Sequence, residues 1–222
     1  MDDTTAKTSL YEQFARIGKA LSNPARLELL DLLAQGERSV EDLARAAGMR
    51  LSNTSAQLKT LSSAGLLTTR RSGTRIYYRI ADCQVTALIT QVQDLASSRL
   101  ADVDRAARDY LGNVQSLEPV GLDELARRAD SGEVLVLDVR PADEYRAGHI
   151  PGAIGIPHDQ LAARLAELPT GADIVAYCRG RYCVFAPKAV RLLREQGYTA
   201  RPLDGGLPDW RQAGLPVAND AA

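Results

Sequence analysis

The hydrophobic pattern of this 222-residue chain changes near residue 112, and this change limits the possible folds more than any other feature. Before that point, apolar residues recur at three- and four-residue steps, as in SLYEQFARIGKAL, which predicts amphipathic helices. After it, apolar runs such as EVLVLDVR and DIVAYC alternate with helical stretches such as HDQLAARLAEL and FAPKAVRLLREQG. This alternation predicts an α/β layer with a mainly parallel sheet, so we expect two domains, 1–112 and 113–222.

Capping and turn residues divide the first domain into the elements of a winged helix-turn-helix. Asn23 followed by Pro24 predicts a helix start, and Ser39 with Asp42 predicts another start for a helix that Gly48 ends. The next helix, in SNTSAQLKTLSSAG, has a short, polar and cationic outer face. LLTTRRSGTRIYYRI then predicts a hairpin around a Ser-Gly turn, so the first domain is expected to be mainly α with one β wing.

The charges of the chain are unevenly distributed and predict a polyanionic partner. The net charge of the whole chain is −1, yet residues 43–81 contain no Asp or Glu. The basic residues of that window are Arg45, Arg50, Lys59, Arg70, Arg71, Arg75 and Arg79. A local cationic surface on a near-neutral protein favours docking of double-stranded DNA at one place, the alternative being a merely solvated face.

The winged helix-turn-helix geometry assigns roles to individual side chains. The hairpin arginines Arg70, Arg71 and Arg75 are expected to contact phosphates. The helix is expected to present Ser52, Asn53, Thr54, Ser55 and Gln57 to base edges, with Lys59 beside them. The alternative is a small helical domain with a hairpin that binds no nucleic acid.

The segment LSNPARLELLDLLAQGERSVEDLARAAGMRLSNTSAQLKTLSSAGLLTTRRSGTRIYYRI resembles the ArsR/SmtB family of bacterial repressors. The resemblance implies a homodimer formed through terminal helices, which leaves its operator DNA when an inducer binds. Many members sense metals through paired cysteines on the helix before the recognition helix. Here that helix is SVEDLARAAG, which has neither Cys nor His, so the metal-sensing role does not carry over.

Residues 85–111 predict a long helix with a break near Ser97-Ser98. Its apolar stripe consists of Val85, Leu88, Ile89, Val92 and Leu95. A helix that leads out of a small domain with such a face is expected to dimerise, the alternative being that it packs only on its own domain.

Two of the three cysteines, Cys178 and Cys183, lie in one loop, directly after the predicted strand DIVAY and before a helix. Ligands of α/β folds bind at the carboxyl ends of strands, where backbone N–H groups and a helix dipole favour anions. With Arg179 and Arg181 adding positive charge, we expect the pKa of Cys178 to be lowered. The alternative is an inert buried cysteine.

Three segments, DVRPADEYRAGHIPGAIGIP, YCRGRYC and LDGGLPDWRQAGLPV, resemble a rhodanese domain. The resemblance implies a sulfurtransferase-type site in which Cys178 carries a persulfide taken from donors such as thiosulfate or polysulfide. Asp138 and Arg140 are then expected to support the loop, and His149 to be structural. The sulfur- or anion-binding loop would consist of Arg179, Gly180, Arg181, Tyr182 and Cys183.

Cys183 departs from the pattern of many single-domain rhodaneses, which have a basic or hydroxyl residue there. A second thiol could attack a persulfide on Cys178 and leave a disulfide, which would make the pair a switch. The alternatives are a small buried residue at the helix start, or a clamp for arsenite or a metal with Cys83 as a third ligand. The five-residue spacing is not that of a zinc knuckle, so we predict no metal and no cofactor.

Together these features predict a DNA-binding transcriptional repressor whose rhodanese domain senses sulfane sulfur or oxidant through Cys178, with Cys183 as its partner. The alternatives are a working thiosulfate or persulfide sulfurtransferase whose DNA binding is secondary, and an arsenic- or metal-responsive repressor. The N-terminus lacks the apolar core of a signal peptide, and no run of about twenty apolar residues occurs. A cytoplasmic protein without a membrane partner is expected.

Overall fold

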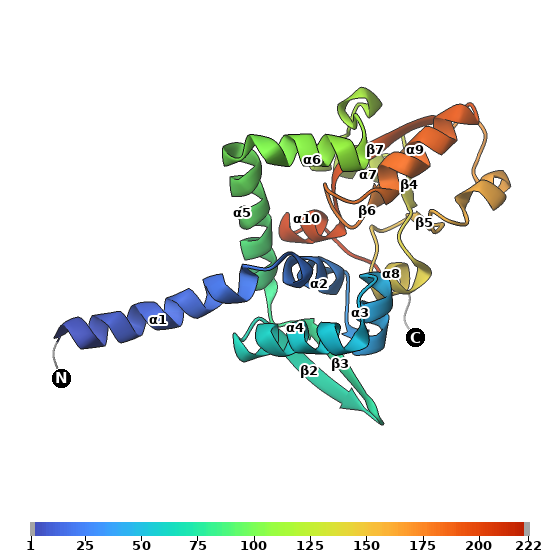
Figure 1. Cartoon of the computed structure of the whole chain (residues 1–222). Coiled ribbons are helices and arrows are strands. Elements are labelled where there is room, and N and C mark those ends of the chain that lie inside the picture. Colours follow the sequence, from blue (N-terminus) through green and yellow to red (C-terminus); the bar gives the residue numbers. More distant parts are fainter. Residues whose placement is uncertain (1–2, 220–222) are drawn as a thin grey trace. The chain divides into compact units, whose positions relative to one another are not determined.

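The computed structural model describes residues 3–219. Two compact units divide the chain, one up to Gln91 and the other from Val92 onward, and the division falls inside helix α5 (Cys83–Arg99) (Figure 1). Among the described residues, no helix is long and apolar enough to cross a membrane. The expected domain boundary at residue 112 stays a prediction.

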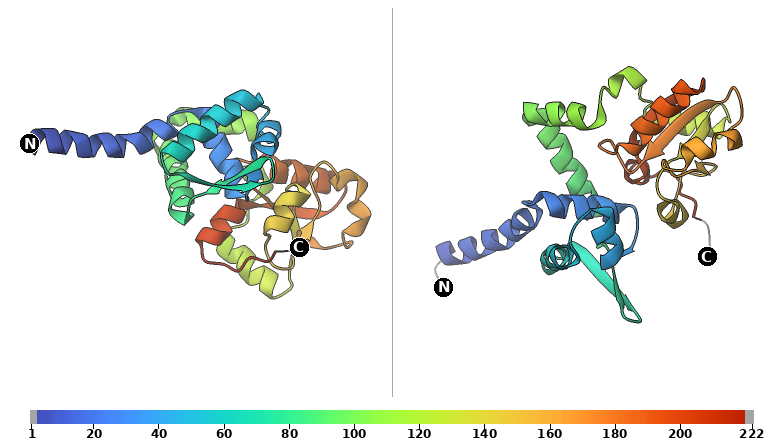
Figure 2. Two further views of the ribbon diagram at one scale, coloured as in Figure 1. Left: turned by 90° about the horizontal axis from the view of Figure 1, so that it is seen from below. Right: turned by 45° about the vertical axis from the view of Figure 1, so that its right-hand side comes forward.

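The first unit is a winged helix-turn-helix, as predicted. Before α5 it contains α1 (Asp3–Leu21), α2 (Pro24–Ala34), β1 (Arg38–Ser39), α3 (Val40–Ala46), α4 (Leu51–Ser63), β2 (Leu67–Ser72) and β3 (Arg75–Ile80). The strands form an antiparallel sheet in the order β1-β3-β2. The β2–β3 hairpin turns at Gly73, whose φ of 61° suits a residue without Cβ, and it extends beyond α4 (Figure 2).

The predicted helix starts are confirmed by their capping hydrogen bonds. The side chain of Asn23 accepts from the backbone N–H of Arg26 at 3.3 Å, and Pro24 opens α2. The hydroxyl of Ser39 accepts from the N–H of Asp42 at 3.2 Å and donates to its carboxylate at 2.6 Å, which starts α3. These local contacts fix α3 and therefore the turn that leads into α4.

Apolar side chains of α2, α3, α4 and α5 form the core of the first unit. Its buried members include Leu29, Leu30, Leu33, Leu43, Leu58, Leu61, Val85 and Ile89. Val85 and Ile89, from the predicted dimerisation stripe, therefore pack on their own unit. By contrast, Leu10 and Phe14 of α1 stay 52% and 61% exposed, so the apolar face of that helix lacks cover within the described chain.

The predicted long helix consists of two helices, α5 and α6 (Ala101–Leu111), and the break lies at Leu100. Leu100 is extended, with φ −115° and ψ 102°, and it stands two residues beyond the predicted Ser97-Ser98 position. The hydroxyl of Ser98 donates to the carbonyl of Leu95 at 3.0 Å. A serine bonded in this way is accommodated inside a helix, which is why the pair does not end α5.

The second unit is an α/β layer around a parallel sheet, as predicted. After α6 it contains α7 (Leu122–Asp130), β4 (Leu135–Asp138), α8 (Ala142–Ala147), β5 (Ile154–Gly155), β6 (Asp173–Cys178), α9 (Phe185–Glu195), β7 (Thr199–Gly206) and α10 (Leu207–Gln212). The strand order is β5-β4-β6-β7, and each neighbouring pair is parallel. The segment HDQLAARLAEL, predicted as helix, instead forms the short 3₁₀ turns Leu161–Ala163 and Leu165–Glu167.

Both faces of this sheet are covered, as is usual for parallel sheets. Alternate residues of β6 serve two cores: Ala176 and Cys178 lie in the core with α9, whereas Tyr177 lies in the core with Trp210 of α10. This alternation brings the sulfur of Cys178 to the carboxyl end of a central strand, on the face that α9 covers.

Candidate functional site

The outer face of α4 carries the polar residues predicted to read DNA, with one correction. Ser52, Asn53, Ser55 and Lys59 are exposed, and Gln57 is half-buried. Thr54 is wrongly placed by the prediction, because its side chain is fully buried and its hydroxyl donates to the carbonyl of Arg50 at 3.2 Å. A residue so enclosed faces the domain core and cannot reach a base edge.

A series of hydrogen bonds that the sequence did not predict orients the outer face of α4, here called the reading face. The guanidinium of Arg26, on α2, donates to the Gln57 side chain at 2.9 Å and to the Ala20 carbonyl at 2.5 Å. The Gln57 amide in turn donates to the Asn53 side chain at 3.0 Å. Arg26 therefore fixes the orientation of both amides, which are the side chains suited to adenine.

The three hairpin arginines differ in their surroundings. Arg70 forms a forked ion pair with Glu37 at 2.6 Å, which lowers the pKa of that carboxyl. The guanidinium of Arg71 donates to the carbonyl of Gly73 at 3.2 Å. Arg75, at the other side of the turn, is exposed and its strongest electrostatic partner is Tyr77. Arg75 is thus better placed than Arg70 to receive a phosphate.

In the second unit, the site is built around Cys178 at the end of β6. The thiol is 1% exposed and lies 3.6 Å from the carbonyl of Cys183 and 3.9 Å from that of Gly180. The backbone N–H of Cys183 donates to the Gly180 carbonyl at 3.0 Å, which closes the loop on itself. All three cysteines are free thiols in this structure.

The acidity of the two loop thiols is the reverse of the expectation for Cys178. Burial, a hydrogen bond to the side chain of Cys183 and the charge of that group raise the pKa of Cys178 well above its usual value. The same hydrogen bond lowers the pKa of Cys183, with help from the backbone N–H groups of Phe185 and Arg179. Deprotonation of the pair therefore favours Cys183, with the Cys178 thiol as the hydrogen-bond donor.

The loop arginines explain part of this reversal, because both are already paired with carboxylates. Arg179 forms a forked ion pair with the buried Glu144 of α8 at 2.6 Å. Arg181 lies 3.2 Å from Asp204 and 3.5 Å from Asp94. The paired carboxylates largely offset the positive charges of Arg179 and Arg181. The prediction that these arginines lower the pKa of Cys178 is therefore wrong.

The loop rests directly on the end of β7. A Cβ placed on Gly206 would lie 2.5 Å from the carbonyl carbon of Arg179 and 2.5 Å from the oxygen of Cys178. The backbone N–H of Gly206 donates to the carboxylate of Asp209 at 2.7 Å. Glycine is therefore required here by close approach of two backbones, which fixes the height of the cysteine loop.

Asp138 and Arg140, predicted to support the loop, form a fully buried ion pair at 2.6 Å. Arg140 also donates to the carbonyl of Gly148 at 2.7 Å, and its guanidinium lies over the ring of Tyr177, 5.6 Å from the centroid. The pair thus joins the end of β4 to the turn at Gly148. At the cysteine loop itself, Glu144 of α8 pairs with Arg179.

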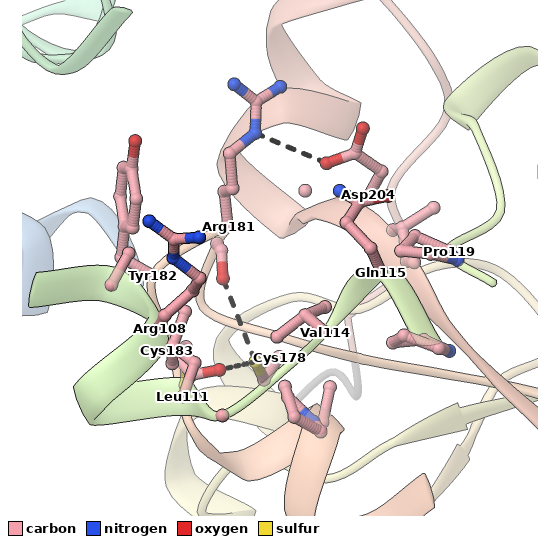
Figure 3. A pocket seen from close by; sticks show the side chains of 18 of the residues that line it. Arg108, Leu111, Val114, Gln115, Pro119, Cys178, Arg181, Tyr182, Cys183 and Asp204 are labelled. Atoms are coloured by element: carbon pink, nitrogen blue, oxygen red, sulfur yellow. Dashed lines mark hydrogen bonds and ion pairs between the residues drawn. The ribbon is translucent and has the colours of Figure 1, made fainter. Parts of the chain in front are cut away.

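A cavity of about 570 Å³ opens over the cysteine loop (Figure 3). Its floor includes Cys178, Cys183 and the loop residues Gly180, Arg181 and Tyr182. The opposite side comes from α6 and the turn after it, including Asp104, Arg108, Leu111 and Gln115. The participation of α6 was not predicted, because nothing in its local pattern marks it as part of a cysteine site.

Among residues 3–219, no group of three or more His, Cys, Asp or Glu side chains could hold a metal ion. Cys83 is exposed and lies in the first unit, whereas the loop thiols lie in the second. The assignment of Cys83 as a third ligand stays a prediction without geometric support.

Two family models match separate parts of the chain. The model described as bacterial regulatory protein, arsR family, matches residues 23–69, and the model of the rhodanese-like domain matches residues 121–213. The first range runs from α2 into the start of β2, and the second contains the whole cysteine loop.

Known proteins similar to this chain include transcriptional regulators and a sulfurtransferase. An HTH-type transcriptional regulator of Mycobacterium tuberculosis is 55% identical over 97% of this chain and 94% of its own length. A sulfurtransferase of Allochromatium vinosum is 36% identical over 41% of this chain and 84% of its own length. A homodimeric winged helix-turn-helix DNA-binding domain from Mycobacterium bovis is 51% identical, covering 46% of this chain and 93% of that one, with a TM-score of 0.42.

Proposed function

This chain belongs to the arsR-family transcriptional regulators that carry a rhodanese-like domain, and from this premise we propose that it reports sulfane sulfur to DNA through Cys178 and Cys183. The first unit binds DNA, as its family does. The observation that carries the proposal is the pairing of two thiols of opposite acidity in one loop, beneath a cavity that a small molecule can enter.

The first chemical step places sulfur on Cys178. Transfer of its proton to the Cys183 thiolate makes Cys178 the nucleophile, because the two sulfurs share a hydrogen bond. The Cys178 thiolate attacks the outer sulfur of a donor R–S–SH, a new S–S bond forms, and the old one breaks. The products are the persulfide Cys178–S–SH and the leaving thiolate R–S⁻.

The second step uses Cys183. Loss to solvent of the proton that Cys183 took up regenerates its thiolate, which attacks the inner sulfur of the Cys178 persulfide. A Cys178–Cys183 disulfide forms and hydrosulfide, HS⁻, leaves. The two thiols are oxidised by two electrons and the sulfane sulfur is reduced to sulfide, so the donor itself is the oxidant.

A disulfide across residues 178–183 reshapes the loop that faces α6. Arg181 and Tyr182 lie between the two cysteines in sequence and line the same cavity as Arg108 of α6. Because α6 follows the helix that leaves the DNA-binding unit, a change in the loop can favour one arrangement of that helix over another. Reduced protein is expected to bind the operator and oxidised protein to leave it, which makes this chain a repressor.

Operator contacts are assigned to the predicted set without the buried Thr54. Asn53 and Gln57, with Ser52 and Ser55, face base edges, and Lys59 contacts the backbone. The hairpin contributes Arg75 first, with Arg71 and Arg70 beside it. Two such modules on a palindromic site require a homodimer, which the uncovered apolar face of α1 supports.

A gel shift on the upstream region of this chain's own gene tests the proposal. Reduced wild-type protein is expected to bind, and treatment with inorganic polysulfide is expected to weaken binding at least tenfold. Cys178→Ser and Cys183→Ser are expected to bind normally and not to respond. Equal affinity of the reduced and polysulfide-treated wild type would refute the sensing role, while the DNA-binding role would stand.

A second candidate is a working sulfurtransferase, which the similarity of the cysteine-loop domain to the Allochromatium vinosum protein favours. In that case persulfide sulfur passes to an external acceptor instead of to Cys183. Sustained thiosulfate:cyanide turnover that Cys178→Ser abolishes and Cys183→Ser preserves, with no change of DNA affinity in either variant, would favour this candidate.

A further inference from the structure

The cavity over the cysteine loop is larger than an inorganic sulfur donor requires. Thiosulfate has about five heavy atoms, roughly 150 Å³ in total if each occupies the ~30 Å³ share of a water molecule. The cavity measures about 570 Å³, within the range of roughly 300–1,000 Å³ that is usual for small organic ligands. Space is therefore left for an organic group attached to the reacting sulfur.

The walls of the cavity carry charges of both signs. Arg108 and Asp104 come from α6, and Asp204 comes from β7. Figure 3 shows Arg108 and Asp204. The guanidinium of Arg108 donates to the carbonyl of Asp104 at 3.2 Å, and within residues 3–219 no carboxylate forms an ion pair with it. Asp204 is already paired with Arg181 at 3.2 Å, so Arg108 and Asp104 are the cation and the carboxylate that suit a group carrying both a carboxylate and an ammonium.

The loop itself offers less for a carboxylate. Arg179 is held by the buried Glu144 at 2.6 Å. Arg181 is half-exposed and is shared between Asp204 and Asp94 at 3.2 and 3.5 Å. Arg108 is the lining arginine without such a partner, so a ligand carboxylate is expected to bind to α6 rather than to the loop.

We infer that this cavity binds organic hydropersulfides, R–S–SH, whose R group is the size of an amino acid or short peptide and carries a carboxylate and an ammonium group. The outer sulfur lies against Cys178, the carboxylate is bound by Arg108, and the ammonium lies near Asp104. The inference rests on the proposed function, since it names the class of donor that the same thiol accepts. The sulfur-transfer step is the one written above, with R–S⁻ leaving through the cavity mouth.

A donor that α6 holds has a further consequence. Arg108 belongs to α6, the helix between the two family-matched segments. A donor bound in the cavity therefore contacts that helix before any covalent step. Organic and inorganic donors therefore differ in whether they contact Arg108 of α6, while both react with the same cysteine.

The test compares two donors on three proteins. Full-length wild type, Arg108→Gln and Arg105→Gln are treated with the hydropersulfide of free cysteine or with inorganic polysulfide, and the rate of sulfur uptake at Cys178 is followed by mass spectrometry. Arg105 is a matched control, because it lies on the same helix, pairs with Asp102 at 2.5 Å and does not line the cavity. Thermal melts establish that all three proteins are folded.

Arg108→Gln is expected to slow sulfur uptake from the organic donor by roughly tenfold to a hundredfold, because one charge-assisted hydrogen bond to the donor is lost. The rate of uptake from inorganic polysulfide is expected to stay unchanged. Arg105→Gln is expected to change neither rate. Equal slowing with both donors, or no slowing with the organic one, overturns the inference. Failure of wild-type Cys178 to accept sulfur from either donor instead overturns the proposed function.

A second measurement avoids the reaction. S-methylcysteine, a non-reacting probe of similar shape, is titrated into Cys178→Ser and into the Cys178→Ser/Arg108→Gln double variant by calorimetry. The inference is supported if S-methylcysteine binds to Cys178→Ser and if its affinity for the double variant is lower by roughly tenfold or more. Equal affinities for both proteins contradict it.

Discussion

At the scale of single residues, the acidity of Cys178 depends on its neighbour more than on its loop. A thiol at a helix N-terminus is usually expected to be acidic. Here burial to 1% exposure and the second thiol outweigh the backbone N–H groups of Ala186 and Gly180 and raise the pKa of Cys178. Cys183, which accepts the hydrogen bond from Cys178, keeps the more stable thiolate.

Cys183→Ser is therefore expected to lower the pKa of Cys178, because one cause of its rise is removed while the backbone donors remain. The midpoint of the pH profile for alkylation of Cys178 by iodoacetamide should move to lower pH, so the thiolate fraction at neutral pH should increase. Peptide mass spectrometry measures this, with the exposed Cys83 as an internal reference thiol.

The same variant should still form a persulfide on Cys178 but no disulfide. A midpoint that stays in place or rises would show that the thiolate is not shared between the two cysteines.

At the scale of elements, two close approaches position the functional surfaces. The end of β7 supports the cysteine loop through Gly206, and α2 holds the reading face of α4 through Arg26 and Gln57. In both cases an element distant in the sequence determines where a predicted functional residue points. Function at each surface is therefore sensitive to a residue that takes no part in the chemistry.

Gly206→Ala is expected to displace the cysteine loop, because the new Cβ would lie 2.5 Å from backbone atoms of Arg179 and Cys178. Overpacking of this kind costs about 1–3 kcal/mol of the free energy of unfolding. Sulfur uptake at Cys178 should slow at least tenfold. Gly121→Ala is the control, since no atom lies within 4 Å of its added Cβ, and normal uptake by Gly206→Ala would contradict the supporting role.

The hairpin gives a prediction for DNA binding. Arg75 is exposed near the tip and should release one counterion on contacting a phosphate. Arg75→Ala is expected to weaken binding of any DNA sequence and to reduce the slope of log affinity against log salt concentration by about 1. Fluorescence anisotropy over a salt series measures the slope. Arg75→Lys keeps the charge and should keep the slope; an unchanged slope in Arg75→Ala would place the hairpin away from the backbone.

At the scale of the whole molecule, an apolar face of α1 is left uncovered by the rest of the described chain. Leu10, Tyr11 and Phe14 of α1 are 52%, 60% and 61% exposed, and the rings of Tyr11 and Phe14 lie edge to face at 5.8 Å. An apolar cluster of this kind on a DNA-binding unit suits a second copy of the chain. The stripe on α5 is less available, because Val85 and Ile89 lie in the unit's own core.

Phe14→Glu is accordingly expected to convert the proposed homodimer to a monomer, because a carboxylate would be buried in an apolar interface. Light scattering after size exclusion gives the mass, and operator affinity should fall in parallel. Lys7→Glu, a charge reversal at another exposed position of α1, should leave the dimer intact. A dimeric Phe14→Glu protein with normal affinity would place the interface elsewhere.

The sequence by itself determined the features that depend on short-range order. Residues near one another in the chain set the periodicity of the helices, the caps at Asn23 and Ser39, the Gly73 turn and the position of Cys178 after β6. The physical reason is that caps, turns and strand ends form between residues a few positions apart, so their partners can be read directly.

Tertiary structure alone decided which charges act on the thiol site and which side chains of α4 are exposed to a partner. Arg179 is compensated by Glu144, 35 residues earlier, and Thr54 is turned into the core by the packing of α4. The acidity of the thiol pair and the wall that α6 contributes to the cavity have the same origin. Burial and ion pairing depend on which distant segments meet, and a pattern of neighbouring residues does not contain that information.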